Sequence, residues 1–181
     1  DLDIVDGGRR DHLRAIRSRQ LDVAFFTGYA PFAGCDVEEL WRERVYVAMA
    51  VPHPLAGCNA LDWSQLRNER FIVSTMEPGP EVHDYIVRRI ADYSTYPNVT
   101  YRHVTEETLM HMVAIGDGIT LVSEGWTSMS YPDLMLRPLT AREDIVPFSA
   151  VWSPSSDNPA LRRFLSFARE LATRRRPRLD Q

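Results

Sequence analysis

The stretch that decides the fold is VTEETLMHMVAIGDGITLVSE at residues 104–124. Thr105 precedes a helical pattern from Glu106 to Ile115, and a threonine side chain is a good acceptor for the free N–H groups of a helix's first turn. Gly116-Asp117-Gly118 then ends the helix, because glycine readily adopts the left-handed backbone found at many helix ends. Ile119 to Val122 follows as a short apolar run typical of a buried strand. The stretch therefore predicts a helix, a tight turn and a buried strand.

Strand and helix patterns alternate along the rest of the chain. Strands are predicted at residues 1–5, 21–26, 37–41, 44–51, 71–74, 99–103, 134–139 and 146–152, and helices at 9–20, 63–66, 80–90, 123–130 and 158–173. Such alternation is typical of an α/β fold, and it favours largely parallel sheets.

Two breaks in this pattern predict a division of the chain into two lobes. The first break lies at residues 74–79 and the second at 141–147. We expect lobe I to contain residues 1–73 and 147–181, and lobe II to contain residues 74–146. The chain would then cross between the lobes near 71–76 and 144–150.

Composition limits the function classes. The chain has 181 residues, of which 44% are hydrophobic, so it is long enough to bury a core. Its formal charge of -4 gives no general attraction to phosphates, so the chain alone is a poor candidate for binding DNA. No apolar run approaches the roughly 20 residues needed to cross a bilayer, and the two cysteines, Cys35 and Cys58, suit a reducing compartment. We expect a cytoplasmic protein with no membrane partner.

Five phrases, taken together and in order, resemble the effector-sensing domain of LysR-type bacterial transcriptional regulators. They are LDVAF at 21–25, YVAMAVPHPL at 46–55, FIVS at 71–74, MVAIGDGITLV at 112–122 and PALRRFL at 159–165. The resemblance runs along nearly all of the chain. It implies the two-lobe fold of type 2 periplasmic binding proteins, with a small effector bound in the cleft between the lobes.

The start of the chain departs from the pattern of this family. Family members carry an N-terminal winged helix-turn-helix, a linker helix, and a first strand and helix of the effector domain before the part that resembles this chain. The chain begins at Asp1 without a methionine. We therefore expect an N-terminally truncated fragment that lacks the DNA-binding domain and the first strand and helix, and we expect DNA contact only through the missing winged helix-turn-helix.

Candidate effector-binding residues follow predicted strands or begin predicted helices. Free N–H groups and the positive end of the helix dipole favour polar ligands at such places. A cap of the helix is an equally good interpretation of Thr105. A glutamate facing the ligand would repel a carboxylate, so we expect either an organic acid or, if Glu107 points inward, a compound with an amine or hydroxyl group. The candidate residues are Thr27, Gly28, Ser74, Thr75, Thr105, Glu107, Thr108 and Ser123.

Catalytic and metal sites are not predicted. Asp11, His12 and Ser18 all lie on one predicted helix rather than at a strand-to-helix elbow. His103 and His111 are eight residues apart, whereas a zinc-binding helix places two histidines four apart. The sequence therefore predicts a protein that is not an enzyme and needs no metal or cofactor.

The sequence as a whole predicts the ligand-sensing domain of a LysR-family regulator. Its effector would control transcription by shifting the population between two arrangements of a homodimer or homotetramer. The alternative is a periplasmic solute-binding protein of a transporter, which has the same fold and would need an export leader. The phrase at residues 46–55 favours the regulator.

Overall fold

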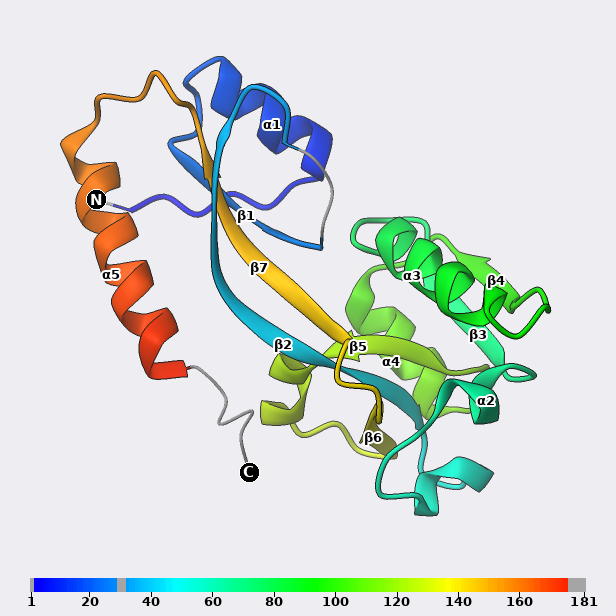
Figure 1. The fold of residues 1–181 in the computed structure, drawn as a ribbon. Helices are drawn as coiled ribbons and strands as arrows, with labels where there is room; N and C mark the ends of the chain where they lie inside the picture. Colours follow the sequence, from blue (N-terminus) through cyan, green and yellow to red (C-terminus); the bar gives the residue numbers. More distant parts are fainter. Residues whose placement is uncertain (1, 29–31, 176–181) are drawn as a thin grey trace. The chain divides into compact units, whose positions relative to one another are not determined.

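A computed structural model describes residues 2–28 and 32–175, and Figure 1 traces the chain. The chain divides into two compact units. Unit 1 consists of Asp1–Glu43 and Val146–Gln181, and unit 2 consists of Arg44–Ile145.

Unit 1 is a sheet covered by one helix on each face. β1 (Val23–Thr27) pairs antiparallel with β7 (Ile145–Trp152), and β7 neighbours β2 (Asp36–Ala50). α1 (Arg9–Arg17) buries Ile16 in a cluster with Val151, whereas α5 (Pro159–Arg175) buries Leu161 in a cluster with Ala150. Because successive strand residues point to opposite faces, these two clusters place α1 and α5 on opposite faces of β7.

Unit 2 contains two small groups of strands. The second half of β2 pairs antiparallel with β5 (Thr120–Ser123) and with β6 (Leu134–Pro138), so β2 lies between them. β3 (Arg70–Ser74) pairs in parallel with β4 (Asn98–Arg102). Ile119 also bonds to β3, because its N–H donates to the Arg70 carbonyl and its carbonyl accepts from Ile72 N–H, both at 2.8 Å. The pairings β1–β7, β2–β5 and β2–β6 are all antiparallel. The prediction of largely parallel sheets is therefore wrong, because strand direction depends on the tertiary partner, which local patterning does not encode.

Two helices cover β3 in unit 2. α3 (Gly79–Ala91) buries Ile86 and Ile90 in a cluster with Phe71 and Val73, whereas α4 (Glu106–Ala114) packs against Ile72, the residue between them. The alternation along the strand places α3 and α4 on opposite faces of β3. Burial of each such large apolar side chain stabilises the fold by about 1.5–3 kcal/mol.

The stretch at residues 104–124 folds as predicted. Thr105 is the N-cap of α4, and its hydroxyl accepts a hydrogen bond from the Thr108 N–H at 3.3 Å. At the other end Gly116 has φ of +86°, and Asp117 N–H donates to the Met112 carbonyl at 3.0 Å. This bond, with the one from Gly116 N–H to the Val113 carbonyl, closes the helix in a Schellman motif.

Most of the other predicted elements are present with shifted ends. The helical turn α2 (Trp63–Leu66) begins at a capping box formed by Asp62 and Gln65. Short 3-10 segments occupy η1 (Pro54–Gly57) and η2 (Glu124–Ser128). The strand predicted at residues 1–5 is absent from residues 2–5, and Asp1 lies outside the described residues.

The first boundary between the units differs from the predicted one. The strands predicted at 37–41 and 44–51 form the single 15-residue strand β2, and the units divide within it, between Glu43 and Arg44. Residues 45–50 pair with β5 and β6, so residues 44–73 belong with the middle of the chain rather than with lobe I. The second boundary lies between Ile145 and Val146, one residue from the predicted position.

A buried carboxylate joins distant parts of unit 2. Asp144 is 2% exposed, and its side chain accepts hydrogen bonds from Trp63 Nε1 at 2.9 Å and Tyr85 Oη at 2.6 Å. Arg89 forms an ion pair with the same carboxylate at 2.6 Å. The Asp144 carbonyl accepts from Val45 N–H at 2.9 Å. One residue thus connects α2, α3 and β2. Burial and the bond to Asp144 raise the pKa of the Tyr85 hydroxyl, which therefore remains a donor at neutral pH.

We predict that Asp144→Ala destabilises the chain by about 3–5 kcal/mol, because it leaves Arg89 partly buried without its main counter-charge. Equilibrium urea unfolding followed by far-UV circular dichroism measures this loss. Glu143→Ala is the control, since the Glu143 carboxylate is mostly exposed and lies 3.8 Å from Arg89. We expect that change to cost less than about 1 kcal/mol. Equal losses in the two variants would contradict this account of Asp144.

Candidate functional site

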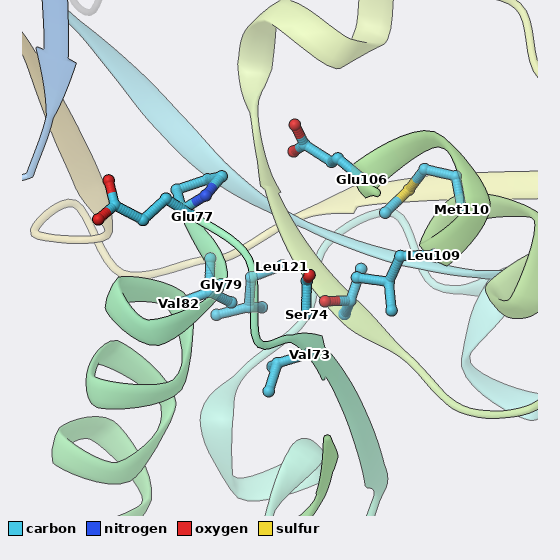
Figure 2. Close-up of a pocket in the computed structure, with 11 residues that line it drawn as sticks. Val73, Ser74, Glu77, Gly79, Val82, Glu106, Leu109, Met110 and Leu121 are labelled. Carbon is cyan, nitrogen blue, oxygen red and sulfur yellow. The ribbon is translucent and has the colours of Figure 1, made fainter. Parts of the chain in front are cut away.

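A pocket in unit 2 opens where β3 ends and where α3 and α4 begin (Figure 2). Ser74 lies between Val82 of α3 and Leu109 of α4 in this view. Most of the lining is apolar, and its polar side chains come from four residues. The apolar side chains are those of Val73, Pro78, Val82, Leu109, Met110 and Leu121, and the polar ones are those of Ser74, Glu77, Glu106 and Thr120.

Ser74 holds the chain segments around the pocket together. Its hydroxyl donates a hydrogen bond to the Val104 carbonyl at 2.6 Å and accepts one from Met76 N–H at 2.9 Å. The side chain is 5% exposed. Ser74 therefore connects the end of β3 to the loop before α3 and to the segment before α4.

The first residue of α3 touches the end of β3. A Cβ atom on Gly79 would lie 1.9 Å from the Ser74 carbonyl oxygen, well inside any real contact distance. Glycine is thus required here for close approach of two backbone segments. This approach sets the distance between the first turn of α3 and the end of β3, and so sets the width of the pocket.

The pocket carries acidic groups at its edge. Glu106 is the first residue of α4. The residue is exposed at the edge of the pocket, and partial loss of solvent on its pocket side raises the pKa of its carboxyl group above the ordinary value of 4.5. No arginine, lysine or histidine is among the described residues that line the pocket. An ionised Glu106 therefore lacks a compensating positive charge in the pocket wall.

The structure brings together only some of the predicted site residues. Ser74 lines the pocket, whereas five others in unit 2 do not: Thr75, Thr105, Glu107, Thr108 and Ser123. Thr75 Oγ1 instead lies 2.7 Å from His103 Nδ1. Ser123 is the N-cap of η2. Thr105 and Thr108 bond to each other in the helix cap.

The remaining two predicted residues belong to unit 1. Thr27 ends β1, and its carbonyl accepts a hydrogen bond from Arg9 at 2.8 Å. Gly28 follows with φ of +85°, and its N–H donates to the Pro147 carbonyl at 3.0 Å. Both residues are half-buried.

Three polar residues of the pocket were not predicted: Glu77, Glu106 and Thr120. In the sequence Glu106 stands out only as the first residue of the predicted helix. A sequence signal existed for Thr120, because it is a polar residue inside the apolar run from Ile119 to Val122. Glu77 has no comparable signal, since loops before helices are commonly acidic.

Residues 2–28 and 32–175 contain no group of three histidine, cysteine, aspartate or glutamate side chains placed to hold a metal ion. Within the same ranges, no helix combines the length and apolar character that crossing a bilayer requires.

The family model described as "LysR substrate binding domain" matches residues 1–173. The chain belongs to this family. Among curated relatives, the regulator XapR of Escherichia coli is 30% identical to this LysR domain over 70% of the chain and 43% of the relative. The regulator ClcR of Pseudomonas putida is 24% identical over 91% of the chain and 56% of the relative.

Solved structures show the same fold. The effector-binding domain of BenM with its effector benzoate superimposes with a TM-score of 0.80 at 19% identity, covering 93% of this chain and 77% of that one. Full-length CbnR in complex with its target DNA gives a TM-score of 0.80 at 15% identity, covering 92% of this chain and 58% of that one. The chain spans about half the length of the curated relatives it matches.

We predict that Gly79→Ala destabilises this LysR domain by about 1–3 kcal/mol, because the added methyl group forces the start of α3 away from β3. Urea unfolding measures the loss. Gly57→Ala is the matched control, since nothing lies within 4 Å of a Cβ placed there. A Gly79 variant as stable as the Gly57 variant would show that the close approach is not required.

We predict a pH-dependent gain in stability from Glu106→Gln. A carboxyl group whose folded-state pKa is raised stabilises the fold below its ordinary pKa, and this contribution is lost as pH rises through the folded-state value. Above the ordinary value of 4.5, wild-type Glu106 ionises at a cost that glutamine avoids. Melting temperatures are measured at about pH 4 and about pH 7, on either side of the ordinary pKa of a glutamate carboxyl group. The advantage of the variant over wild type should be larger at about pH 7. Glu107→Gln, the neighbouring control, should lack this gain, and an equal gain there would refute the assignment to the pocket.

Proposed function

We propose that this LysR domain senses a small-molecule effector and controls transcription within a longer DNA-binding regulator. The observation that carries the proposal is the pocket at the start of α3 and α4, in a chain whose family model covers residues 1–173. Pockets with mostly apolar walls and a few directed polar groups are typical of small-molecule sites.

The named relatives support a regulator over the alternative of a transporter's solute-binding protein. XapR and ClcR are both named as transcriptional regulators of the helix-turn-helix type. BenM is named with benzoate as its effector, and CbnR with its target DNA. These names also favour a regulatory role over an enzymatic one.

Occupancy of the pocket would act through α3. The pocket is lined by the first turn of this helix, and two turns later Tyr85 and Arg89 bind Asp144. Asp144 lies one residue before Ile145, the last residue of unit 2. Its carbonyl accepts a hydrogen bond from Val45 N–H, and Val45 is the second residue of unit 2. A ligand that favours one position of α3 would therefore favour one arrangement at both boundaries, as a population shift requires.

The wider function follows as part of the same proposal. The effector would bind in the cleft between the lobes, with Thr27 and Gly28 as predicted contacts from lobe I. Its binding would rearrange a homodimer or homotetramer, and this rearrangement would change how the attached winged helix-turn-helix domains bind DNA. Coupling of this kind is typically 1–3 kcal/mol, or about 5–150-fold in affinity.

The test is retention of a metabolite by the chain. We predict that the chain, incubated with the low-molecular-weight fraction of a bacterial extract and washed by ultrafiltration, retains a compound detectable by mass spectrometry. Val82→Phe should abolish retention, because the larger ring fills the pocket that Val82 lines.

Val87→Phe is the matched control. Val87 is half-buried on the same helix and does not line the pocket, so this variant should retain the compound. Circular dichroism checks that both variants fold. The proposed function fails if wild-type protein retains nothing, or if Val82→Phe retains as much as wild type.

A further inference from the structure

We infer that the pocket takes a small aliphatic ligand carrying a protonated amine rather than a carboxylate. This inference rests on the proposed function and specifies its ligand class. It depends on two independent features of the pocket wall, the hydroxyl of Thr120 and the carboxylate of Glu106, together with the absence of basic side chains among the described lining residues.

Thr120 offers a buried hydroxyl to the pocket. The residue is 1% exposed and lines the pocket, yet its hydroxyl hydrogen-bonds to no described residue. The hydroxyl oxygen is not among the fully buried side-chain atoms that lack a partner, so it keeps access to the pocket and can form a hydrogen bond there. A polar group on a bound ligand provides the missing partner.

Glu106 supplies the charge. It forms no ion pair or hydrogen bond with any described residue, and Figure 2 shows its carboxylate above Ser74 and Met110. An ammonium group is the simplest complement to a partly desolvated carboxylate, because hydrogen bonds between opposite charges are the strong ones. Such a ligand would stabilise the ionised form of Glu106.

The start of α3 does not reverse this preference. A helix N-terminus resembles about half a positive charge and favours anions. In α3, however, Gly79, Glu81 and Val82 already donate their N–H groups to backbone carbonyls, and Pro80 has none to donate. A ligand carboxylate would meet this partial charge together with the negative charge of Glu106 at the edge of the same pocket.

The walls determine the rest of the ligand. The apolar lining consists of aliphatic side chains, a proline and a methionine, with no aromatic ring among the described lining residues. Such a surface favours a branched or linear hydrocarbon group beside the amine.

A matched set of three probes tests the charge preference. Isobutylamine, isobutanol and isobutyrate share one carbon skeleton and carry positive, zero and negative charge at pH 8. Binding to the chain is measured by NMR titration in about 0.15 M salt, which screens exposed charges. Shifts of the Ser74, Gly79 and Leu121 amides locate the site. We expect isobutylamine to bind at least tenfold more tightly than isobutyrate, as about 1.4 kcal/mol would give.

Variants separate the two contributions. Glu106→Gln should reduce isobutylamine affinity about tenfold and leave isobutanol unchanged, because it removes only the charge. Thr120→Val should weaken both isobutylamine and isobutanol. Glu81→Gln is the control, since Glu81 lies in the first turn of α3 and does not line the pocket. It should leave all three affinities unchanged.

The inference is overturned if isobutyrate binds as tightly as isobutylamine, if Glu106→Gln leaves the preference intact, or if none of the probes shifts these amides. Each of these results leaves the proposed function standing when a metabolite is still retained and Val82→Phe abolishes its retention. The converse result is saturable isobutylamine binding with no retained metabolite. It would support the ligand class and overturn the sensing function.

Discussion

The Asp144 carboxylate is the constraint on which the arrangement of unit 2 depends. It is almost fully buried and binds Trp63, Tyr85 and Arg89 through its side chain. A buried charge is tolerated only when its hydrogen-bonding capacity is met, so each of these partners must keep its place. The position of α3 against the rest of unit 2 is therefore fixed by polar geometry as well as by apolar packing.

The pocket depends on this placement. α3 begins at Gly79, whose backbone touches the Ser74 carbonyl, and it continues to Tyr85 and Arg89 at the Asp144 cluster. Because a packed helix behaves as a rigid element, a displacement of its first turn also displaces Tyr85 and Arg89 at the cluster. The same cluster lies beside both boundaries between the units in sequence. α3 thus connects the pocket to the Asp144 cluster.

The pocket was only partly predictable from the sequence. Ser74 was found because it follows a buried strand, and the family phrase at 71–74 marks the same place. Thr75, Thr105 and Thr108 fit the same rule, yet their hydroxyls are engaged with His103 or with the helix cap. A residue's place at a strand end or helix start specifies its backbone environment. The direction of its side chain depends on the packing of other elements, and it is this direction that decides whether it faces the pocket.

The sequence by itself determined the local elements and the family. The cap at Thr105, the turn at Gly116 and the apolar runs of the strands are set by interactions between residues close in the chain. Only the tertiary structure decided which strands pair, in which direction, and where the units divide within β2. It also decided that Asp144, 59 residues beyond Tyr85, would be buried beside it. These features join residues far apart in sequence, and their energies depend on burial and charge pairing that exist only once the chain has folded.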